Sequence, residues 1–184
     1  MDNGGTIYGY WRIAMWSGAA LLLSLPALAM QFFPAAGVDW SGVDFVVMGI
    51  LLLLACGAVE IGARMSRNLL YRGGVIVAVG SGFITIWVNL AVGMIQDEGN
   101  HANLLFLGVL GIAALGTLAA RFATRGMAQA MLAAGIAQAT IALYVAISGL
   151  DSPYIAMLIS LFALPWLLSA GLFHAAMRQA LARC

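Results

Sequence analysis

The sequence predicts an all-α fold: an integral membrane six-helix bundle built from three tandem helical hairpins. Three observations support this prediction. Of the 184 residues, 64% are hydrophobic and only 8% are charged, whereas about 25% of the residues in a soluble domain are charged. The apolar residues gather into helix-length runs, and the arginines recur at a fixed interval along the chain. The whole chain, residues 1–184, is therefore expected to form one transmembrane domain.

Six apolar runs are each long enough to cross a hydrocarbon core of about 30 Å as a helix. They cover residues 12–33, 44–63, 74–95, 102–120, 127–149 and 154–176. The first contains Pro26, which removes one backbone hydrogen bond and is expected to kink the helix. The sixth contains Pro165 near its middle. Taken in pairs, the runs predict hairpins at about 12–64, 72–121 and 125–178.

The charges are sorted by sign between the two sets of connections. All eight basic residues are arginines, and they flank the ends of the hairpins: Arg12, Arg64, Arg67, Arg72, Arg121, Arg125, Arg178 and Arg183. Acidic residues fall at the opposite ends: Asp39, Asp44, Asp97, Glu98 and Asp151. Because basic loops stay in the cytoplasm, both termini are expected to be cytoplasmic in a bacterial inner membrane. The net charge of +1 gives no indication of a nucleic-acid partner.

An internal repeat accompanies this pattern. Arg64, Arg121 and Arg178 follow one another at an interval of 57 residues and close the second, fourth and sixth runs. The same shift aligns Gly57 with Ala114 and Gly171. Equal periods are typical of stacked supersecondary units. Each hairpin would enter from the same side, which argues against a transporter built from inverted repeats.

Glu60 is the only acidic residue within a predicted span, four residues before Arg64. That spacing favours an ion pair along the helix, in which Glu60 only orients the arginine. The alternative is a proton or cation site, because acidic residues inside membranes are costly and are kept for use. The 57-residue repeat also aligns Glu60 with Thr117 and His174. Around a pseudo-threefold axis these side chains would lie at one depth near the cytoplasmic face, where a pair of Glu60 and His174 would titrate near neutrality.

Three further polar residues lie in or near the spans. Asn89 and Gln138 are expected to hold neighbouring helices together by hydrogen bonds, with the lining of a pore or pocket as the alternative. His174 is expected to be a satisfied interface residue, with a titrating or ligating role as the alternative. The arginines of the connections are expected to meet lipid head groups and to fix the topology; they are Arg64, Arg67, Arg72, Arg121, Arg125 and Arg178.

The loop at residues 96–103 gathers two acids, a histidine and several amides. Asp97, Glu98 and His101 are weak candidates for a divalent cation site, and the competing interpretation is a solvated turn in which Asn100 caps the next helix. No cofactor is expected, because His101 and His174 would lie on opposite faces of the membrane, and no catalytic triad, metalloprotease motif, phosphate loop or CxxC pair occurs.

Several segments resemble known membrane proteins. Leu23-Ser24-Leu25-Pro26 and Val46-Val47-Met48-Gly49-Ile50-Leu51, together with the three short hairpins, are similar to the HdeD family of acid-resistance membrane proteins. The resemblance implies the six-span repeat plan. The segments 87–93 and 100–103 also resemble uncharacterised small inner-membrane proteins of Gram-negative bacteria. Neither resemblance implies a catalytic residue.

The function expected from the sequence is that of a non-enzymatic inner-membrane protein, accessory, structural or stress-related, that acts by helix packing in a homo-oligomer or a larger complex. The alternative is a small channel or permease with a polar path near Glu60, Asn89, Gln138 and His174. A membrane enzyme would need clustered acids, bases or metal ligands, and only the 96–103 loop offers any.

Overall fold

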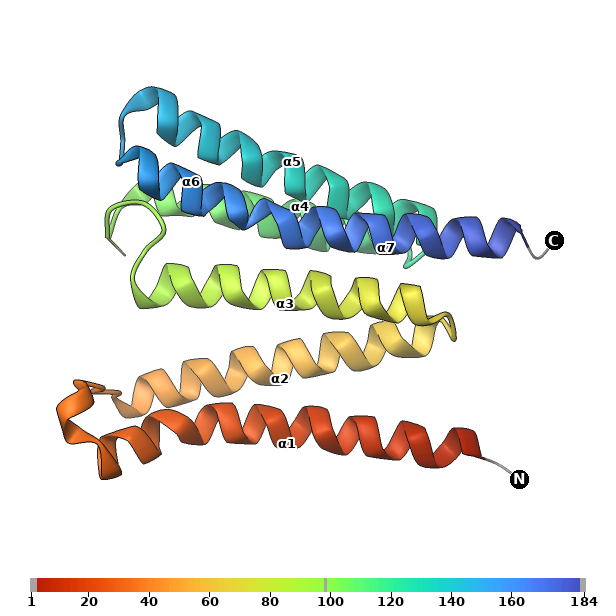
Figure 1. Cartoon of the computed structure of the whole chain (residues 1–184), viewed down its shortest axis with the longest axis horizontal. Coiled ribbons are helices and arrows are strands. Elements are labelled where there is room, and N and C mark those ends of the chain that lie inside the picture. Colours follow the sequence, from red (N-terminus) through yellow and green to blue (C-terminus); the bar gives the residue numbers. More distant parts are fainter. Residues whose placement is uncertain (1–2, 98, 183–184) are drawn as a thin grey trace. The chain divides into compact units, whose positions relative to one another are not determined.

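The computed structural model describes residues 3–97 and 99–182, and the side chains of those from residue 10 onward. The described residues form helices and no strands (Figure 1). Within this part of the chain, six helical spans are long and apolar enough to cross a membrane. The predicted all-α class and the number of helices long and apolar enough to span a membrane are therefore confirmed.

Two compact units make up the chain, Met1–Glu60 and Ile61–Cys184. The first contains α1 (Asn3–Phe32), the 3₁₀ turn η1 (Pro34–Ala36) and most of α2 (Gly42–Met65). The second contains the end of α2 and all later elements: α3 (Leu69–Ala91), η2 (His101–Leu104), α4 (Leu105–Ala119), α5 (Thr124–Ser148), α6 (Pro153–Leu161) and α7 (Ala163–Leu181).

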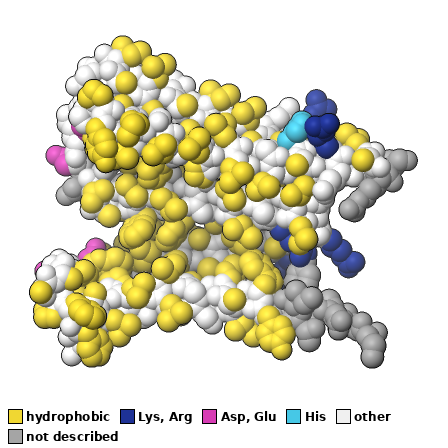
Figure 2. Space-filling model, in the orientation of Figure 1, with side chains coloured by type: hydrophobic (Ala, Val, Ile, Leu, Met, Phe, Trp, Pro, Cys, Tyr) yellow, Lys and Arg dark blue, Asp and Glu magenta, His cyan; other side chains and the backbone are white. Residues whose placement is uncertain are grey.

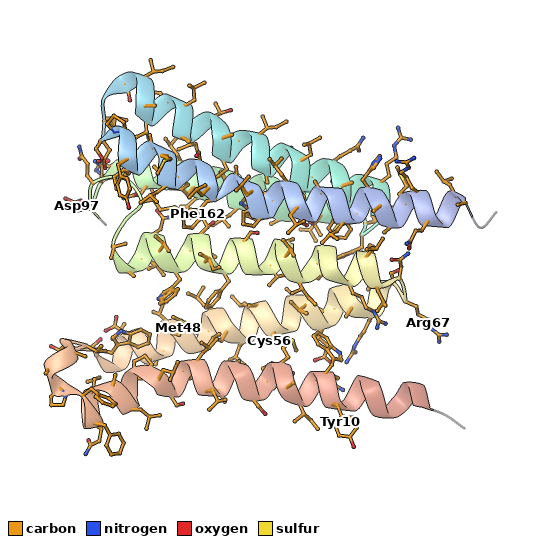
Figure 3. All side chains as sticks on the ribbon, in the orientation of Figure 1. Tyr10, Met48, Cys56, Arg67, Asp97 and Phe162 are labelled. Atoms are coloured by element: carbon orange, nitrogen blue, oxygen red, sulfur yellow. The ribbon has the colours of Figure 1, made fainter. Side chains whose placement is uncertain are left out.

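In the first unit, α1 continues through Pro26 and extends nine residues before the predicted start at residue 12, to Asn3. The candidate span within it is Tyr10–Phe32. A capping box begins α2: the Asp44 carboxylate accepts from the Ser41 N–H at 2.7 Å, and the Ser41 hydroxyl accepts from the Asp44 N–H at 3.4 Å. Along α2 a stripe at helical spacing is buried, and Met48 and Cys56 mark its course in Figure 3.

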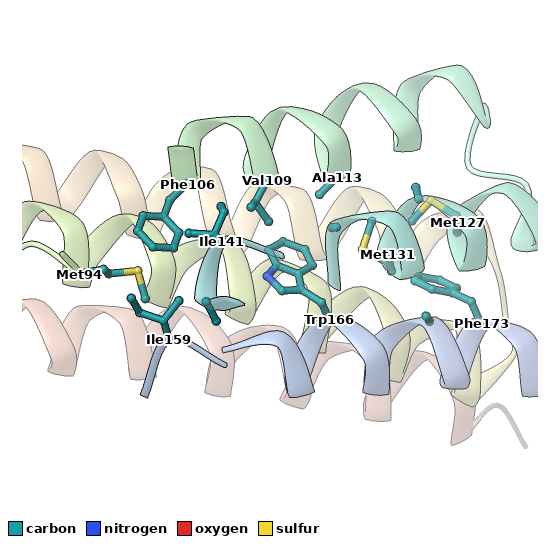
Figure 4. Close-up of a cluster of buried hydrophobic side chains, with 14 of the residues drawn as sticks. Met94, Phe106, Val109, Ala113, Met127, Met131, Ile141, Ile159, Trp166 and Phe173 are labelled. Carbon is teal, nitrogen blue, oxygen red and sulfur yellow. The ribbon is translucent and has the colours of Figure 1, made fainter. Parts of the chain in front are cut away.

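The second unit is a bundle in which α5 packs against α4, α6 and α7, and α3 packs against α7. Its core contains large apolar side chains, among them Trp166, Phe106, Phe173 and Met131 (Figure 4). Small residues let the helices approach closely. A Cβ atom on Gly74 of α3 would lie 3.0 Å from the Phe173 ring of α7.

The sixth predicted helix, residues 154–176, is not continuous. It is divided at Phe162 into α6 and α7. Pro165 causes the break, because it has no N–H to offer to the carbonyl of Leu161 and its ring crowds that carbonyl. At the break itself, the Phe162 N–H bonds to Ile159 O at 3.2 Å, three residues back. Beyond the break, α7 continues to Leu181, five residues past the predicted end.

Candidate functional site

The arginines of the second unit gather at one end of it. Two hydrogen bonds join the connections at this end: Asn68 Nδ2 donates to Gln179 Oε1 at 3.2 Å, and the Tyr71 hydroxyl donates to Phe122 O at 2.9 Å. The first ties the α2–α3 connection to the end of α7, and the second ties α3 to the α4–α5 connection. Four exposed arginines belong to these segments: Arg67, Arg121, Arg125 and Arg178.

The α4–α5 turn has an unusual backbone. Arg121 and Phe122 have φ angles of 47° and 60°, in the left-handed region that non-glycine residues seldom adopt. Burial of the Tyr71 side chain and its hydrogen bond to Phe122 O hold this turn in place. As a result, the exposed side chain of Arg121 extends from a fixed turn, whereas Arg178 lies in the last turn of α7.

The opposite end of the second unit is polar and acidic. In Figure 3, Arg67 marks the arginine end and Asp97 marks the acidic end. Figure 2 shows the arginine side chains and the acidic side chains at opposite ends of this unit. The Gln96 N–H donates to the Asp151 carboxylate at 2.7 Å, and Gln96 Nε2 donates to Leu150 O at 2.8 Å. These two bonds join the α3–α4 loop to the α5–α6 loop.

Asn103 organises the α3–α4 loop from inside. Its side-chain oxygen accepts from the N–H groups of Met94 and Ile95 at 3.0 and 2.9 Å, and its amide nitrogen donates to Ile95 O and Asp97 O. Asn103 is buried. One side chain therefore satisfies four backbone groups of the loop that follows α3.

Of the three loop residues predicted as metal ligands, Asp97 and His101 belong to the described part of the chain. Asp97 and His101 are exposed, and the Asp97 carboxylate accepts from the Gly99 N–H at 3.1 Å. Glu98 lies outside the described residues. Across the part of the chain that is described, no group of three or more His, Cys, Asp or Glu side chains is placed to hold a metal ion. Asn100 caps η2, accepting from the Ala102 N–H at 2.8 Å.

Glu60 forms an ion pair with Arg12, which the sequence pattern does not predict. Its carboxylate lies 2.8 Å from the Arg12 guanidinium, which joins α2 to α1 within the first unit. The Arg12 side chain is 51% exposed and that of Glu60 only 15%. The pair of Glu60 with Arg64, which the spacing within α2 predicts, stays a prediction. A partner on a different helix, such as Arg12, leaves no such periodic signal in the sequence.

The other intramembrane candidates have three different environments. Gln138 is fully buried and its Nε2 donates to Ile159 O of α6 at 3.3 Å, an interhelical bond of the expected kind. Asn89 is half-buried and donates to Thr85 O of its own helix at 2.8 Å. His174 is exposed on α7, and Thr117 is half-buried on α4. The expected cluster of Glu60, Thr117 and His174 stays a hypothesis, and the exposure of His174 counts against it.

Several residues that organise the second unit were not singled out by sequence reasoning. Ser169 is fully buried and its hydroxyl donates to Gly74 O at 2.8 Å, joining α7 to α3. Tyr71 packs edge-to-face on Phe173, with ring centroids 5.1 Å apart. A serine or tyrosine in an apolar run gives no sign of its partner, because that partner lies about a hundred residues away in the chain.

Compared with known protein families, with curated proteins and with solved structures, this chain has no match.

Proposed function

We propose that the chain is an integral protein of the bacterial inner membrane whose spans form three tandem hairpins with a period of 57 residues. Both termini would be cytoplasmic. The sorting of arginines and acids to opposite ends of the second unit supports this topology, because arginine-rich loops are retained in the cytoplasm. At that face, Arg64, Arg67, Arg72, Arg121, Arg125 and Arg178 would contact anionic lipid head groups.

The topology has a direct test in Arg67→Cys and Asp97→Cys, two exposed positions at opposite ends of the second unit. Both would be placed in a background with Cys56→Ala and Cys184→Ser. An impermeant maleimide should label Asp97→Cys in intact spheroplasts and Arg67→Cys only in inverted vesicles. The reverse pattern would overturn the orientation, and labelling of both from one side would overturn membrane insertion of the bundle.

We further propose a non-enzymatic role, as an accessory, structural or stress-related subunit that acts by helix packing in a homo-oligomer or a larger membrane complex. One observation carries this proposal: in the most apolar stretch of the Tyr10–Phe32 span, no residue is buried by other parts of the chain. Large side chains along this helix are exposed, including Leu21, Leu25 and Leu28. The core of the second unit, by contrast, is filled with its own side chains.

Cross-linking between copies tests this role. In the same cysteine-substituted background, Leu21→Cys and Leu25→Cys on α1 are compared with Leu143→Cys, an exposed position on α5. Disulfide cross-linking in native membranes should join two copies through α1 and not through Leu143→Cys, and native mass spectrometry should report the copy number. Equal cross-linking at all three sites, or a monomer without other subunits, would contradict the proposal.

A small channel or permease is the second candidate function. The observation that favours it is that Asn89 Oδ1 and Gln138 Oε1 are buried without hydrogen-bond partners among the described residues. A polar path would need such groups, together with Glu60 and His174. Proteoliposomes loaded with a pH-sensitive or ion-sensitive dye separate the two functions. Flux above that of protein-free vesicles, reduced by Gln138→Leu and unchanged by Gln129→Leu on the exposed side of α5, would favour the channel.

A further inference from the structure

Four polar atoms inside the described spans have no hydrogen-bond partner among the described residues: Thr85 Oγ1, Asn89 Oδ1, Gln138 Oε1 and Trp166 Nε1. Thr85 and Gln138 are 0% exposed, and Trp166 is 2% exposed. Buried polar groups are nearly always paired, because an unpaired one carries the full cost of losing water. Four such atoms in one bundle therefore require an explanation.

Helix packing brings two of these residues to the same level of the bundle. On α3, Gly74 lies against Phe173, and farther along the helix a Cβ atom on Gly82 would lie 3.8 Å from the Trp166 ring. Of these two contacts, the one nearer the C-terminus of α3 is nearer the N-terminus of α7, so the two helices are antiparallel. Thr85 follows Gly82 by about one turn on the same face, which places it beside the start of α7, at the α6–α7 break.

The same reasoning applies to α5. A Cβ atom on Gly135 would lie 3.4 Å from Trp166 Cβ. Gln138 follows Gly135 by about one turn, and its Nε2 already donates to Ile159 O at the end of α6. The Gln138 carboxamide is therefore at the break as well, approaching it from α5 while Thr85 approaches it from α3.

Trp166 lies one turn beyond the break, between these two helices. Its indole nitrogen is on the edge of the ring directed toward the part of the core that contains Ile141 and Ile159 (Figure 4). Pro165 removes the helical donor for the carbonyl of Leu161. The break thus lies in a region that contains unpaired side-chain atoms.

The chemistry of these atoms defines what would pair with them. The indole N–H only donates, the carboxamide oxygen only accepts, and the hydroxyl does both. All of them are uncharged, so the occupant is an uncharged molecule with both donors and acceptors. It is also small, because Thr85, Gln138 and Trp166 are buried within a packed core. Water meets each of these conditions.

We propose that the second unit binds water at the α6–α7 break, between the Thr85 hydroxyl, the Gln138 carboxamide oxygen and the Trp166 indole N–H. Asn89, one turn beyond Thr85, extends the polar site along α3. The water donates to and accepts from the side-chain atoms that their apolar surroundings leave without partners. This proposal concerns the interior of the second unit and does not depend on the proposed function.

Nuclear magnetic resonance of the ¹⁵N-labelled full chain in lipid nanodiscs tests the site. The indole N–H signal of Trp166, assigned with Trp166→Phe, should show a cross-peak to water. The cross-peak should be lost in Thr85→Val combined with Gln138→Leu, and should persist in Thr85→Ser. Thr140→Val is the matched control, because the Thr140 hydroxyl bonds to its own helix on an exposed face. A Trp166 N–H without a water cross-peak, or with one to another solute, would overturn the proposal.

The melting temperature of Thr85→Val gives an independent readout, since the substitution preserves shape. If water is bound, the variant loses one of the water's partners and the melting temperature falls by a few degrees. If the hydroxyl is buried in a dry core, removing it relieves an unpaired group and the melting temperature rises, which would contradict the proposal.

Discussion

Gly116 of α4 lies directly against Ala130 of α5. A Cβ atom added to Gly116 would be 2.6 Å from the Ala130 Cβ and 3.3 Å from its Cα. The obstacle is a methyl group attached to a helix backbone, so no side-chain rotation can relieve it. The two helices therefore keep this separation only because residue 116 has no side chain.

Gly116→Ala is expected to destabilise the bundle by about 1–3 kcal/mol, the usual cost of overpacking a close contact. Gly111→Ala on the same helix is the matched control, because a Cβ atom there would meet nothing within 4 Å. Thermal unfolding in detergent should separate the two variants. Equal melting temperatures would show that α4 and α5 are farther apart than described.

Asn103→Leu should destabilise the α3–α4 loop by about 2–3 kcal/mol, because buried backbone groups of the loop lose their partners together. Hydrogen exchange should then accelerate at the Met94 and Ile95 amides, both of which donate to Asn103. Asn100→Ala, which removes the cap of η2 and the hydrogen bond from Asn100 Nδ2 to Gln96 Oε1, should cost about 1 kcal/mol. If exchange at these two amides does not change, the described hydrogen bonds are absent.

Tyr71→Phe should cost about 1 kcal/mol, because it removes only the hydroxyl that bonds to Phe122 O. The ring remains in place against Phe173. Faster hydrogen exchange is expected at the α4–α5 turn, where Arg121 and Phe122 have positive φ. Tyr144→Phe, at an exposed position on α5, should leave both stability and exchange unchanged.

The Arg12–Glu60 pair should show a measurable coupling between α1 and α2. In a double-mutant cycle with Arg12→Ala and Glu60→Gln, the coupling free energy is expected to be about 0.5–1 kcal/mol, since the exposed Arg12 side chain is screened by solvent. The same cycle with Arg125→Ala in place of Arg12→Ala should give no coupling. A coupling of zero in the first cycle would exclude the ion pair.

The sequence predicted the helical spans well and their ends less well. The six apolar runs are helical over most of their length, although the sixth is divided at Phe162. Their ends depended on local chemistry. The α3 helix begins at Leu69, earlier than predicted, because the Asn68 side chain accepts from the N–H groups of Leu70 and Tyr71. Asn68 lies between Arg67 and Arg72 in the sequence, and the predicted start of the helix did not take its capping role into account.

The interior of the candidate sites was not predictable to the same extent. Gln138 stands out in the sequence as a lone polar residue in a span, but its contact with Ile159 O depends on how α5 packs against α6. The α6–α7 break had a visible cause in Pro165, yet a proline does not always interrupt a span: α1 continues through Pro26. Packing around each proline decides between these outcomes.

The sequence by itself determined the helical class, the six spans and the sorting of arginines from acids, because these follow from composition and order along the chain. Only the tertiary structure decided that Glu60 pairs with Arg12, that Asn103 ties together its loop, and that Gln138 donates to Ile159 O at the end of α6. The physical reason is that hydrogen bonds and ion pairs between helices depend on the register of packing. In apolar helices without a strong polar face, many registers are compatible with the same sequence pattern.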